Sequence, residues 1–148
     1  MKKTRVIAIA ALVAVCIAGW AILSMTAVSD AQAQKNTIAT AQYYRDKKLF
    51  QLSLQNYQAA LSSKTTEELY DEYLATCDAY YEDSPTATVR STEESAYAAA
   101  VGVYPARADY WTKYASLYYE DGDYSKLIEV LKSASANGIA FDETLQGY

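Results

Sequence analysis

The residues best suited to bind a metal ion are the carboxylates Glu120, Asp121 and Asp123, which surround Gly122. Such a cluster suggests calcium, but the EF-hand loop requires acids at alternating positions, glycine at the sixth position and glutamate at the twelfth. The residues around Gly122 lack that pattern, so the sequence predicts a turn followed by a helix with Asp123 as its cap. We therefore expect no metal and no cofactor.

Acid–base catalysis is the second chemistry to consider, because glycoside hydrolysis requires a pair of carboxylates. Several acids stand close together in the chain, at Glu67, Glu68, Asp71, Glu72, Asp78, Glu93 and Glu94. Their spacing predicts that they lie on the solvent faces of helices. The chain also has no histidine, which excludes Ser-His and Cys-His nucleophile pairs and His-ligated zinc. We therefore expect that the protein is not an enzyme.

The two cysteines also predict no chemistry. Lipidation of Cys16 would require a small residue before it, where the chain has Val15. We expect Cys16 to face lipid or a neighbouring helix. Cys77 is the only thiol beyond residue 28 and is flanked by small residues, which predicts a packing role.

An uncharged, largely apolar segment covers residues 6–28, behind a cationic tail of residues 1–5. As a helix rising about 1.5 Å per residue, it reaches roughly 34 Å, enough to cross a hydrocarbon core of about 30 Å. The cations of the tail place the amino terminus in the cytoplasm. We therefore expect a transmembrane signal-anchor with the rest of the chain outside the membrane. The alternative is cleavage at Ala31-Gln32-Ala33, which would give a secreted protein.

The charge beyond this segment is strongly negative. All 18 acids but only 10 of the 13 bases follow it, which gives a net charge of −8. This balance opposes binding to nucleic acid or to anionic lipid. It favours a cationic or neutral protein or peptide partner, although a solvated acidic surface that keeps the protein soluble is the simpler explanation.

The remainder of the chain predicts an all-α fold, because apolar residues recur at spacings of three and four and no stretch alternates with period two. Residues 29–36 are expected to form a juxtamembrane helix or linker. Two helices should follow up to Ala60, with a break near Asp46 to Lys48. A capping box of Thr65 and Glu68 predicts a helix over about 66–81, ended by the polar segment 82–86.

Three further helices are expected. Ser91 and Glu94 have the spacing of a second capping box, which predicts a helix from there through Val101, closed by Gly102 and Pro105. Another should cover about 107–120, and the next should begin after Asp123 and stop at 137–138. A last short helix is predicted from Asp142.

The last full pair of these helices carries a recognisable pattern. Trp111, Tyr114, Ala115 and Tyr118 have the spacing W-x2-L-G-x2-Y, Gly122-x-Tyr124 forms the turn, and Leu131 and Ala134 follow as the large and small residues of the second helix. The chain here resembles the tetratricopeptide repeat (TPR) family, in its membrane-anchored bacterial form. The alternative is a plain helical bundle, which does not require the Gly-x-Tyr turn or a closing proline.

Two earlier helical pairs resemble the same pattern in less detail. The first is marked by Ala41, Tyr44, Phe50, Tyr57 and Ala60, and the middle one by Tyr97, Ala100, Val101 and Pro105. The first helix of the middle pair fits two registers, through Leu74-Ala75 or through Tyr73, Cys77 and Tyr80. Trp111 lies 74 residues after the equivalent Thr37, whereas two repeats of about 34 residues make roughly 68. The residues by which the observed spacing exceeds two repeats are expected in the loop 82–90.

The resemblance implies a short TPR-like α-solenoid of about three helical hairpins over residues 37–141, followed by a tail of residues 142–148. In this family the first helices line a concave groove that binds extended peptides or partner helices. The positions that the resemblance and the exposed tyrosines assign to such a groove are Gln42, Arg45, Tyr81, Asp109, Thr112, Ser116 and Tyr119. Tyr118, in contrast, shares the core stripe of Trp111.

The expected function is therefore that of a membrane-anchored scaffold that binds a protein or peptide outside the membrane. The alternative is a structural spacer, or the amino-terminal part of a longer surface protein that presents a further domain.

Overall fold

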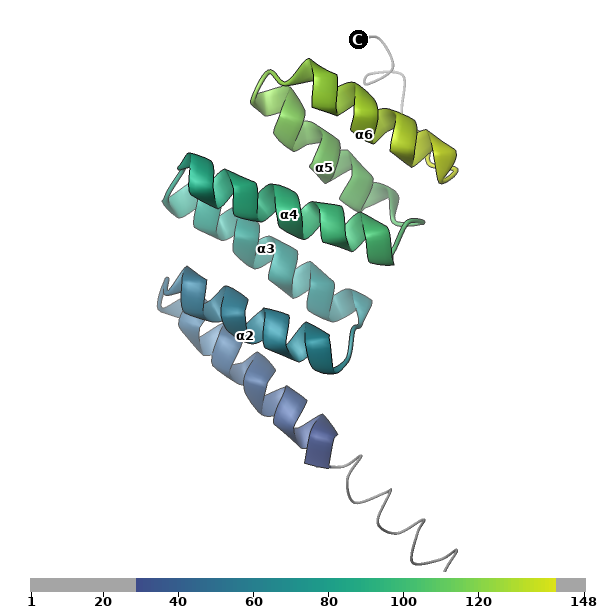
Figure 1. Ribbon diagram of the computed structural model, residues 1–148. Helices are drawn as coiled ribbons and strands as arrows, with labels where there is room; N and C mark the ends of the chain where they lie inside the picture. Colours follow the sequence, from purple (N-terminus) through teal and green to yellow (C-terminus); the bar gives the residue numbers. More distant parts are fainter. Residues whose placement is uncertain (1–28, 141–148) are drawn as a thin grey trace, which may run out of the picture.

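The computed structural model describes residues 29–140, which form six α-helices and contain no strand (Figure 1). The all-α fold expected from the sequence is confirmed for this part of the chain. The amino-terminal helix covers residues 29–46, so the predicted juxtamembrane segment is helical. The others are α2 (Phe50–Ser63), α3 (Glu67–Asp83), α4 (Ala87–Val103), α5 (Ala108–Glu120) and α6 (Tyr124–Ala136).

The helices form three hairpins that stack on one another in chain order (Figure 1). Helix α3 packs against α2 and α4, and α5 packs against α4 and α6. The second helix of each hairpin begins at Phe50, Ala87 or Tyr124, a constant spacing of 37 residues. The arrangement is that of a short α-solenoid.

This spacing corrects the expected position of the extra residues. They do not form a long loop over 82–90, because α3 ends at Asp83 and α4 begins at Ala87. Helices α3 and α4 are each 17 residues long, whereas α5 and α6 have 13. The middle hairpin therefore takes up the additional length as extra helical turns.

The helix starts show where capping patterns succeed and fail. The side chain of Thr66, and not the predicted Thr65, accepts a hydrogen bond from the Leu69 N–H at the start of α3. Helix α4 begins at the Thr86 cap, so the predicted capping box at Ser91 is wrong and Ser91 lies inside the helix. A threonine cap satisfies a free helix N–H without a partnering glutamate.

The turn before α6 is as predicted. The Asp123 side chain accepts a hydrogen bond from the Lys126 N–H, and Gly122 has a φ of 70°, in the region that glycine adopts without strain. Lys48 occupies the equivalent position of the first hairpin, with a φ of 57°. The predicted end of α6 also holds, whereas Gly102, predicted to close α4, lies inside that helix.

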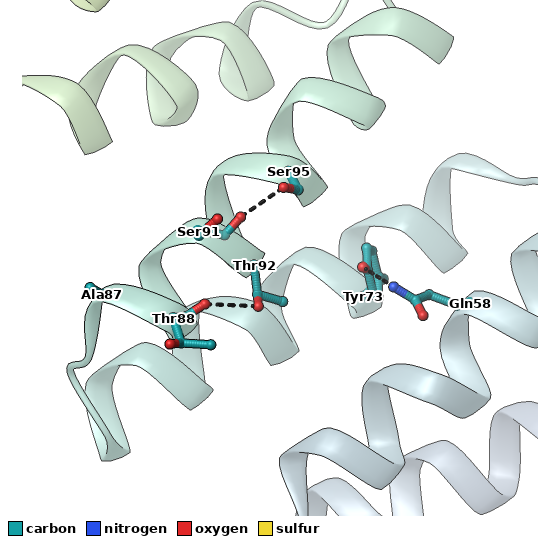
Figure 2. Close-up of a pocket in the computed structure, with 7 residues that line it drawn as sticks. All are labelled: Gln58, Tyr73, Ala87, Thr88, Ser91, Thr92 and Ser95. Atoms are coloured by element: carbon teal, nitrogen blue, oxygen red, sulfur yellow. Dashed lines mark hydrogen bonds between the residues drawn. The ribbon is translucent and has the colours of Figure 1, made fainter.

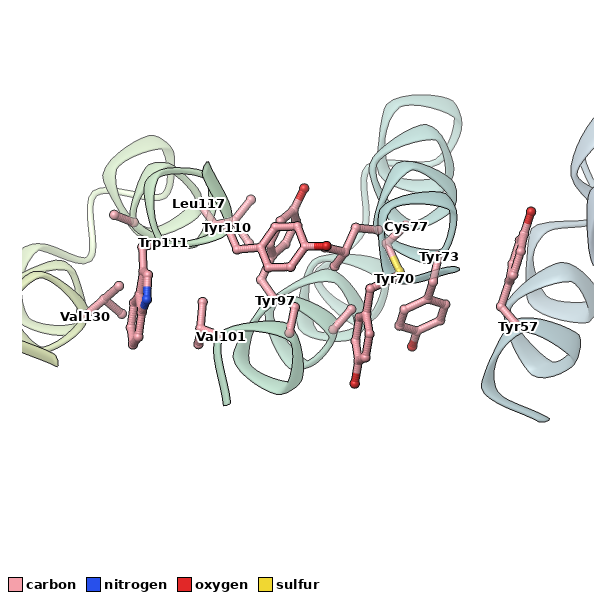
Figure 3. Close-up of a cluster of buried hydrophobic side chains, with 14 of the residues drawn as sticks. Tyr57, Tyr70, Tyr73, Cys77, Tyr97, Val101, Tyr110, Trp111, Leu117 and Val130 are labelled. Atoms are coloured by element: carbon pink, nitrogen blue, oxygen red, sulfur yellow. The ribbon is translucent and has the colours of Figure 1, made fainter. Parts of the chain in front are cut away.

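The core consists largely of aromatic rings and small residues (Figure 3). Trp111 on α5 is buried with Val101 of α4 on one side and Val130 of α6 on the other, so it joins the second and third hairpins. Ala41, Ala115 and Ala134 are fully buried, which allows the helices of a hairpin to approach closely. The sequence left two registers open for α3, and the structure buries residues of both: Tyr73, Leu74 and Cys77.

The buried tyrosines keep their hydroxyl groups paired with acids. Four hydroxyls donate to carboxylates of another helix: Tyr57 to Glu72 at 2.8 Å, Tyr97 to Asp78 at 3.0 Å, Tyr110 to Asp71 at 2.7 Å and Tyr118 to Glu94 at 3.3 Å. Burial, followed by the nearby carboxylate, raises the pKa of Tyr57, Tyr97 and Tyr110, so these phenols remain neutral donors. These bonds link helices through the apolar core.

The two neighbouring tyrosines of α5 face as the sequence predicts. Tyr118 is 6% exposed and Tyr119 is 42% exposed. Adjacent positions on a helix point about 100° apart, so only one of the pair joins the core.

None of the helices within residues 29–140 is long and apolar enough to cross a membrane. The predicted span 6–28 and the predicted helix from Asp142 lie outside the described residues.

Candidate functional site

A cavity lined largely by polar side chains lies on the side of the second helices, between α2 and α4 (Figure 2). It is about 630 Å³ in volume and is lined by Gln58, Tyr73 and hydroxyl residues of α4. Three of these polar groups already donate hydrogen bonds: Ser95 to the Ser91 carbonyl, Thr92 to the Thr88 carbonyl and the Gln58 amide to the Tyr73 hydroxyl. The cavity offers a ligand no charged side chain.

The second cavity, about 300 Å³ in volume, is built from two consecutive hairpins, and we call it the junction pocket. Its walls are the first helix of the second hairpin, α3, and the first helix of the third hairpin, α5. The lining residues are Asp78, Tyr81 and Glu82 on α3, Lys113, Ser116, Leu117 and Glu120 on α5, and Pro85, Arg90 and Glu93. Acids outnumber bases among these residues. The junction pocket therefore suits a cationic or hydrogen-bond-donating group.

Arg90 on α4 is the centre of the junction pocket. Its side chain is only 9% exposed and pairs with Glu93 at 2.9 Å, Glu120 at 3.1 Å and Asp121 at 3.3 Å. The guanidinium also lies 3.9 Å from the ring centre of Tyr81 on α3. A guanidinium is suited to this role because it offers several donors in one plane and stacks on aromatic rings. Arg90 thereby connects α3, α4 and the turn between α5 and α6.

One atom of this residue has no partner among the described residues: the buried Nε of Arg90. An unsatisfied buried N–H is costly, and because this atom has no exposed surface, a ligand in the junction pocket could pair with it only if the surrounding side chains moved.

The neighbouring carboxyl group of Glu93 is unusual because it is almost fully buried, with a side-chain exposure of 6%. Burial, reinforced by the nearby Asp78 carboxylate and opposed by Arg90, raises the pKa of Glu93 to about 7. Its proton is therefore bound and released near neutral pH. Glu93 also contradicts the sequence prediction that the acids between residues 67 and 94 all face solvent.

This pKa shift predicts a pH dependence of stability. Between the ordinary glutamate pKa of 4.5 and about 7, folded Glu93 holds a proton that the unfolded chain has released. The folded state then binds more protons, so the free energy of unfolding should fall as pH rises through this window. In the Glu93→Gln variant, we expect the decrease in the free energy of unfolding over this pH window to be smaller by on the order of 1–3 kcal/mol.

Urea unfolding from pH 4.5 to 8 measures this effect. Glu68→Gln, at an exposed position of α3, is the control and should keep the decrease seen in the native protein. A Glu93→Gln protein that loses stability as steeply as the native one would contradict the assignment.

Two of the predicted groove residues line the junction pocket. Tyr81 and Ser116, from α3 and α5, are brought to the same cavity. Gln42 and Arg45 lie elsewhere: the Gln42 amide donates to Glu72 of the second hairpin at 2.9 Å, and Arg45 donates to the Tyr57 hydroxyl of its own hairpin at 3.5 Å. Their polar groups therefore join helices.

The other predicted residues of α5 are spread along that helix. Asp109 pairs with Arg107 at 2.6 Å, and Thr112 is exposed with its hydroxyl bonded to the Ala108 carbonyl. Tyr119 lies against Tyr124 of α6, with ring centres 6.3 Å apart. None of the three lines the junction pocket.

Arg90 and Glu93 are the site residues that the sequence analysis missed. The incorrect capping box placed Arg90 in a loop, although its spacing of three residues from Glu93 is that of a helical ion pair. Neither the junction pocket nor any other part of residues 29–140 gathers three or more acid or cysteine side chains in a geometry that could hold a metal ion.

No protein-family model matches the chain, and no curated protein matches it.

Proposed function

We propose that the protein is a membrane-anchored, TPR-like helical scaffold that binds a protein or peptide partner outside the membrane. The segment 6–28 is its anchor, and the stack of three hairpins is its binding part. The observation that carries the proposal is the junction pocket, a charged cavity on the side of the first helices.

The chemistry of the junction pocket supports a partner segment with a lysine or arginine side chain. Asp78, Glu82, Glu93 and Glu120 outnumber Arg90 and Lys113 there, and the protein as a whole carries a net charge of −5. A cationic side chain gains attraction from these acids, of which Glu93 and Glu120 already pair with Arg90 while Asp78 and Glu82 do not. The overall negative charge accelerates the approach of such a partner.

A lysine introduced at Ser116 tests this proposal. Ser116 lines the junction pocket and its hydroxyl bonds only to the Lys113 carbonyl within its own helix, so Ser116→Lys should leave thermal unfolding nearly unchanged. The added cation occupies the pocket and repels a cationic partner. We expect the Kd for the partner to rise at least about tenfold, which corresponds to about 1.4 kcal/mol. The yield of partner captured by cross-linking and affinity purification of the intact protein should fall accordingly.

Ser133→Lys is the matched control, because it adds the same charge at an exposed position of α6 outside the junction pocket. It should leave the capture yield unchanged. Equal yields for the native protein and both variants would contradict binding at the junction pocket.

A structural spacer is the second candidate function, and Arg107 is the observation that favours it. This residue, in the connection between α4 and α5, pairs with Glu67 at 3.1 Å and Asp71 at 3.0 Å on α3. Its guanidinium also lies 4.2 Å from the ring centre of Tyr110. Such cross-links between hairpins stiffen a stack that holds another domain away from the membrane.

The anchor is tested by the mature amino terminus. Because residues 6–28 are longer than the apolar region of roughly 7–15 residues in a cleavable signal peptide, we expect the native protein to retain them. Sequencing the amino terminus of protein purified from membranes should give a start ahead of residue 6. A start at Gln34 would instead show cleavage and a secreted protein.

A further inference from the structure

Helix α6 carries an apolar surface that no other described element covers. Tyr124, Ile128 and Leu131, here called the α6 stripe, follow one another at helical spacing, and with Leu127 they line a cavity of about 260 Å³. Tyr124 is 56% exposed and Ile128 is 46% exposed. Apolar side chains grouped in this way mark an interaction surface.

The repeat itself indicates what kind of element covers such a stripe. The equivalent positions of α2 lie 74 residues earlier in the chain and are all buried. They are Phe50, Leu54 and Tyr57, which correspond to Tyr124, Ile128 and Leu131. Helix α3 of the next hairpin buries them: the Phe50 ring stacks on Tyr80 at 5.4 Å, and the Tyr57 hydroxyl bonds to Glu72. The α6 stripe therefore continues the stacking interface and has the chemistry to receive another helix.

We propose that a second copy of this chain covers the α6 stripe, with the two α6 helices packed antiparallel about a two-fold axis near Ile128. A two-fold interface needs a self-complementary surface, and a short apolar stripe centred on one residue satisfies this requirement. Each stripe would then fill the cavity of the other.

Charge complementarity favours this partner. With Ile128 on the axis, Lys132 of one copy lies opposite Tyr124 of the other, beside the acidic turn of Glu120, Asp121 and Asp123. The antiparallel arrangement thus places an exposed lysine of each copy beside the acidic turn of its mate. Arg90 and Lys126 pair with this turn within the chain but do not cover it, because the Glu120 side chain is 58% exposed and the Asp123 side chain is 40% exposed. It also aligns the opposite ends of the two helix dipoles.

The charge of the remaining surface points the same way. Helix α3 carries seven acids and no base, whereas α6 has Lys126 and Lys132 against a single acid, Glu129. Two copies of an acidic chain repel each other, and the repulsion is smallest where they meet through α6.

Disulfide cross-linking of the full chain in detergent tests this proposal. In a Cys16→Ser background, Ile128→Cys places a thiol on the axis, and mild oxidation should convert most of the protein to a covalent dimer. Cys77 is only 1% exposed and does not compete. The matched control is Leu52→Cys, at an apolar position on α2 with 42% exposure, which should remain monomeric.

Light scattering during gel filtration provides the second measurement. The native chain should be dimeric, Ile128→Asp should raise the dimer Kd at least about tenfold, and Lys132→Glu should raise it less. Leu52→Asp should have no effect. A native chain that stays monomeric at high concentration, with no cross-linking at position 128, would overturn the proposal and indicate that another segment or another protein covers the α6 stripe.

Discussion

Replacement of Trp111 by alanine should destabilise the protein by about 3–5 kcal/mol, the usual range for truncating a buried aromatic residue. Trp111 is 5% exposed and its indole N–H donates to the Pro105 carbonyl at 2.9 Å. Its loss leaves a cavity between the second and third hairpins and an unpaired carbonyl. Thermal unfolding should show a midpoint lowered by roughly 10–20 °C.

Tyr43→Ala is the control for this experiment. Tyr43 is an aromatic residue of the amino-terminal helix that is 58% exposed, so its truncation should change the midpoint by no more than a few degrees. A Trp111→Ala protein that unfolds at the native temperature would contradict both the packing of the third hairpin and the importance of the stacking contact.

Replacement of Arg90 by alanine should have a comparable effect for a different physical reason. The substitution leaves Glu93 buried without its cation, and breaking a buried ion pair from one side costs about 3–5 kcal/mol. It also removes the ring contact with Tyr81 and the links to Glu120 and Asp121. Urea unfolding at about pH 8.5 measures the loss, because Glu93, with a pKa of about 7 beside Arg90, is ionised in the native protein there.

A double-mutant cycle separates the buried charge from the packing. Arg90→Ala combined with Glu93→Gln should be more stable than the single Arg90→Ala variant, because the uncompensated carboxylate is gone. Purely additive losses would show that Arg90 does not act through Glu93 and would leave its contacts with Tyr81, Glu120 and Asp121 as the source of its contribution. A loss below about 1 kcal/mol for Arg90→Ala would contradict its assigned role at the centre of the junction pocket.

The local features of the fold were predictable from the sequence. The turn at Gly122 and the cap at Asp123 depend on the backbone preferences of one or two residues, so the pattern and the structure agree there. The separation of Tyr118 from Tyr119 follows from helical geometry and needs no tertiary information. The predictions failed where a capping pattern occurred by chance inside a helix, as at Ser91 and Glu94, while the true cap at Thr86 lacked the reciprocal glutamate.

The candidate site was only partly predictable, because it depends on contacts between hairpins. Tyr81 and Ser116 belong to helices separated by more than 20 residues of chain, and the stacking of α5 on the middle hairpin brings them to one pocket. Gln42 and Arg45 are also polar, but they lie outside the junction pocket, where the Gln42 amide bonds to Glu72 and Arg45 bonds to the Tyr57 hydroxyl.

From the amino-acid sequence it follows that residues 29–140 are helical, that the chain beyond residue 28 is acidic and lacks histidine, and where most of the helices end. These properties depend on composition and on neighbours within one or two turns. The packing of the hairpins is needed to see that Arg90 and Glu93 are buried, that tyrosines and acids pair across helices, and that no other part of residues 29–140 covers the α6 stripe. Each of these outcomes depends on the distance between side chains of different hairpins, and helix stacking sets that distance whereas the spacing along the chain does not.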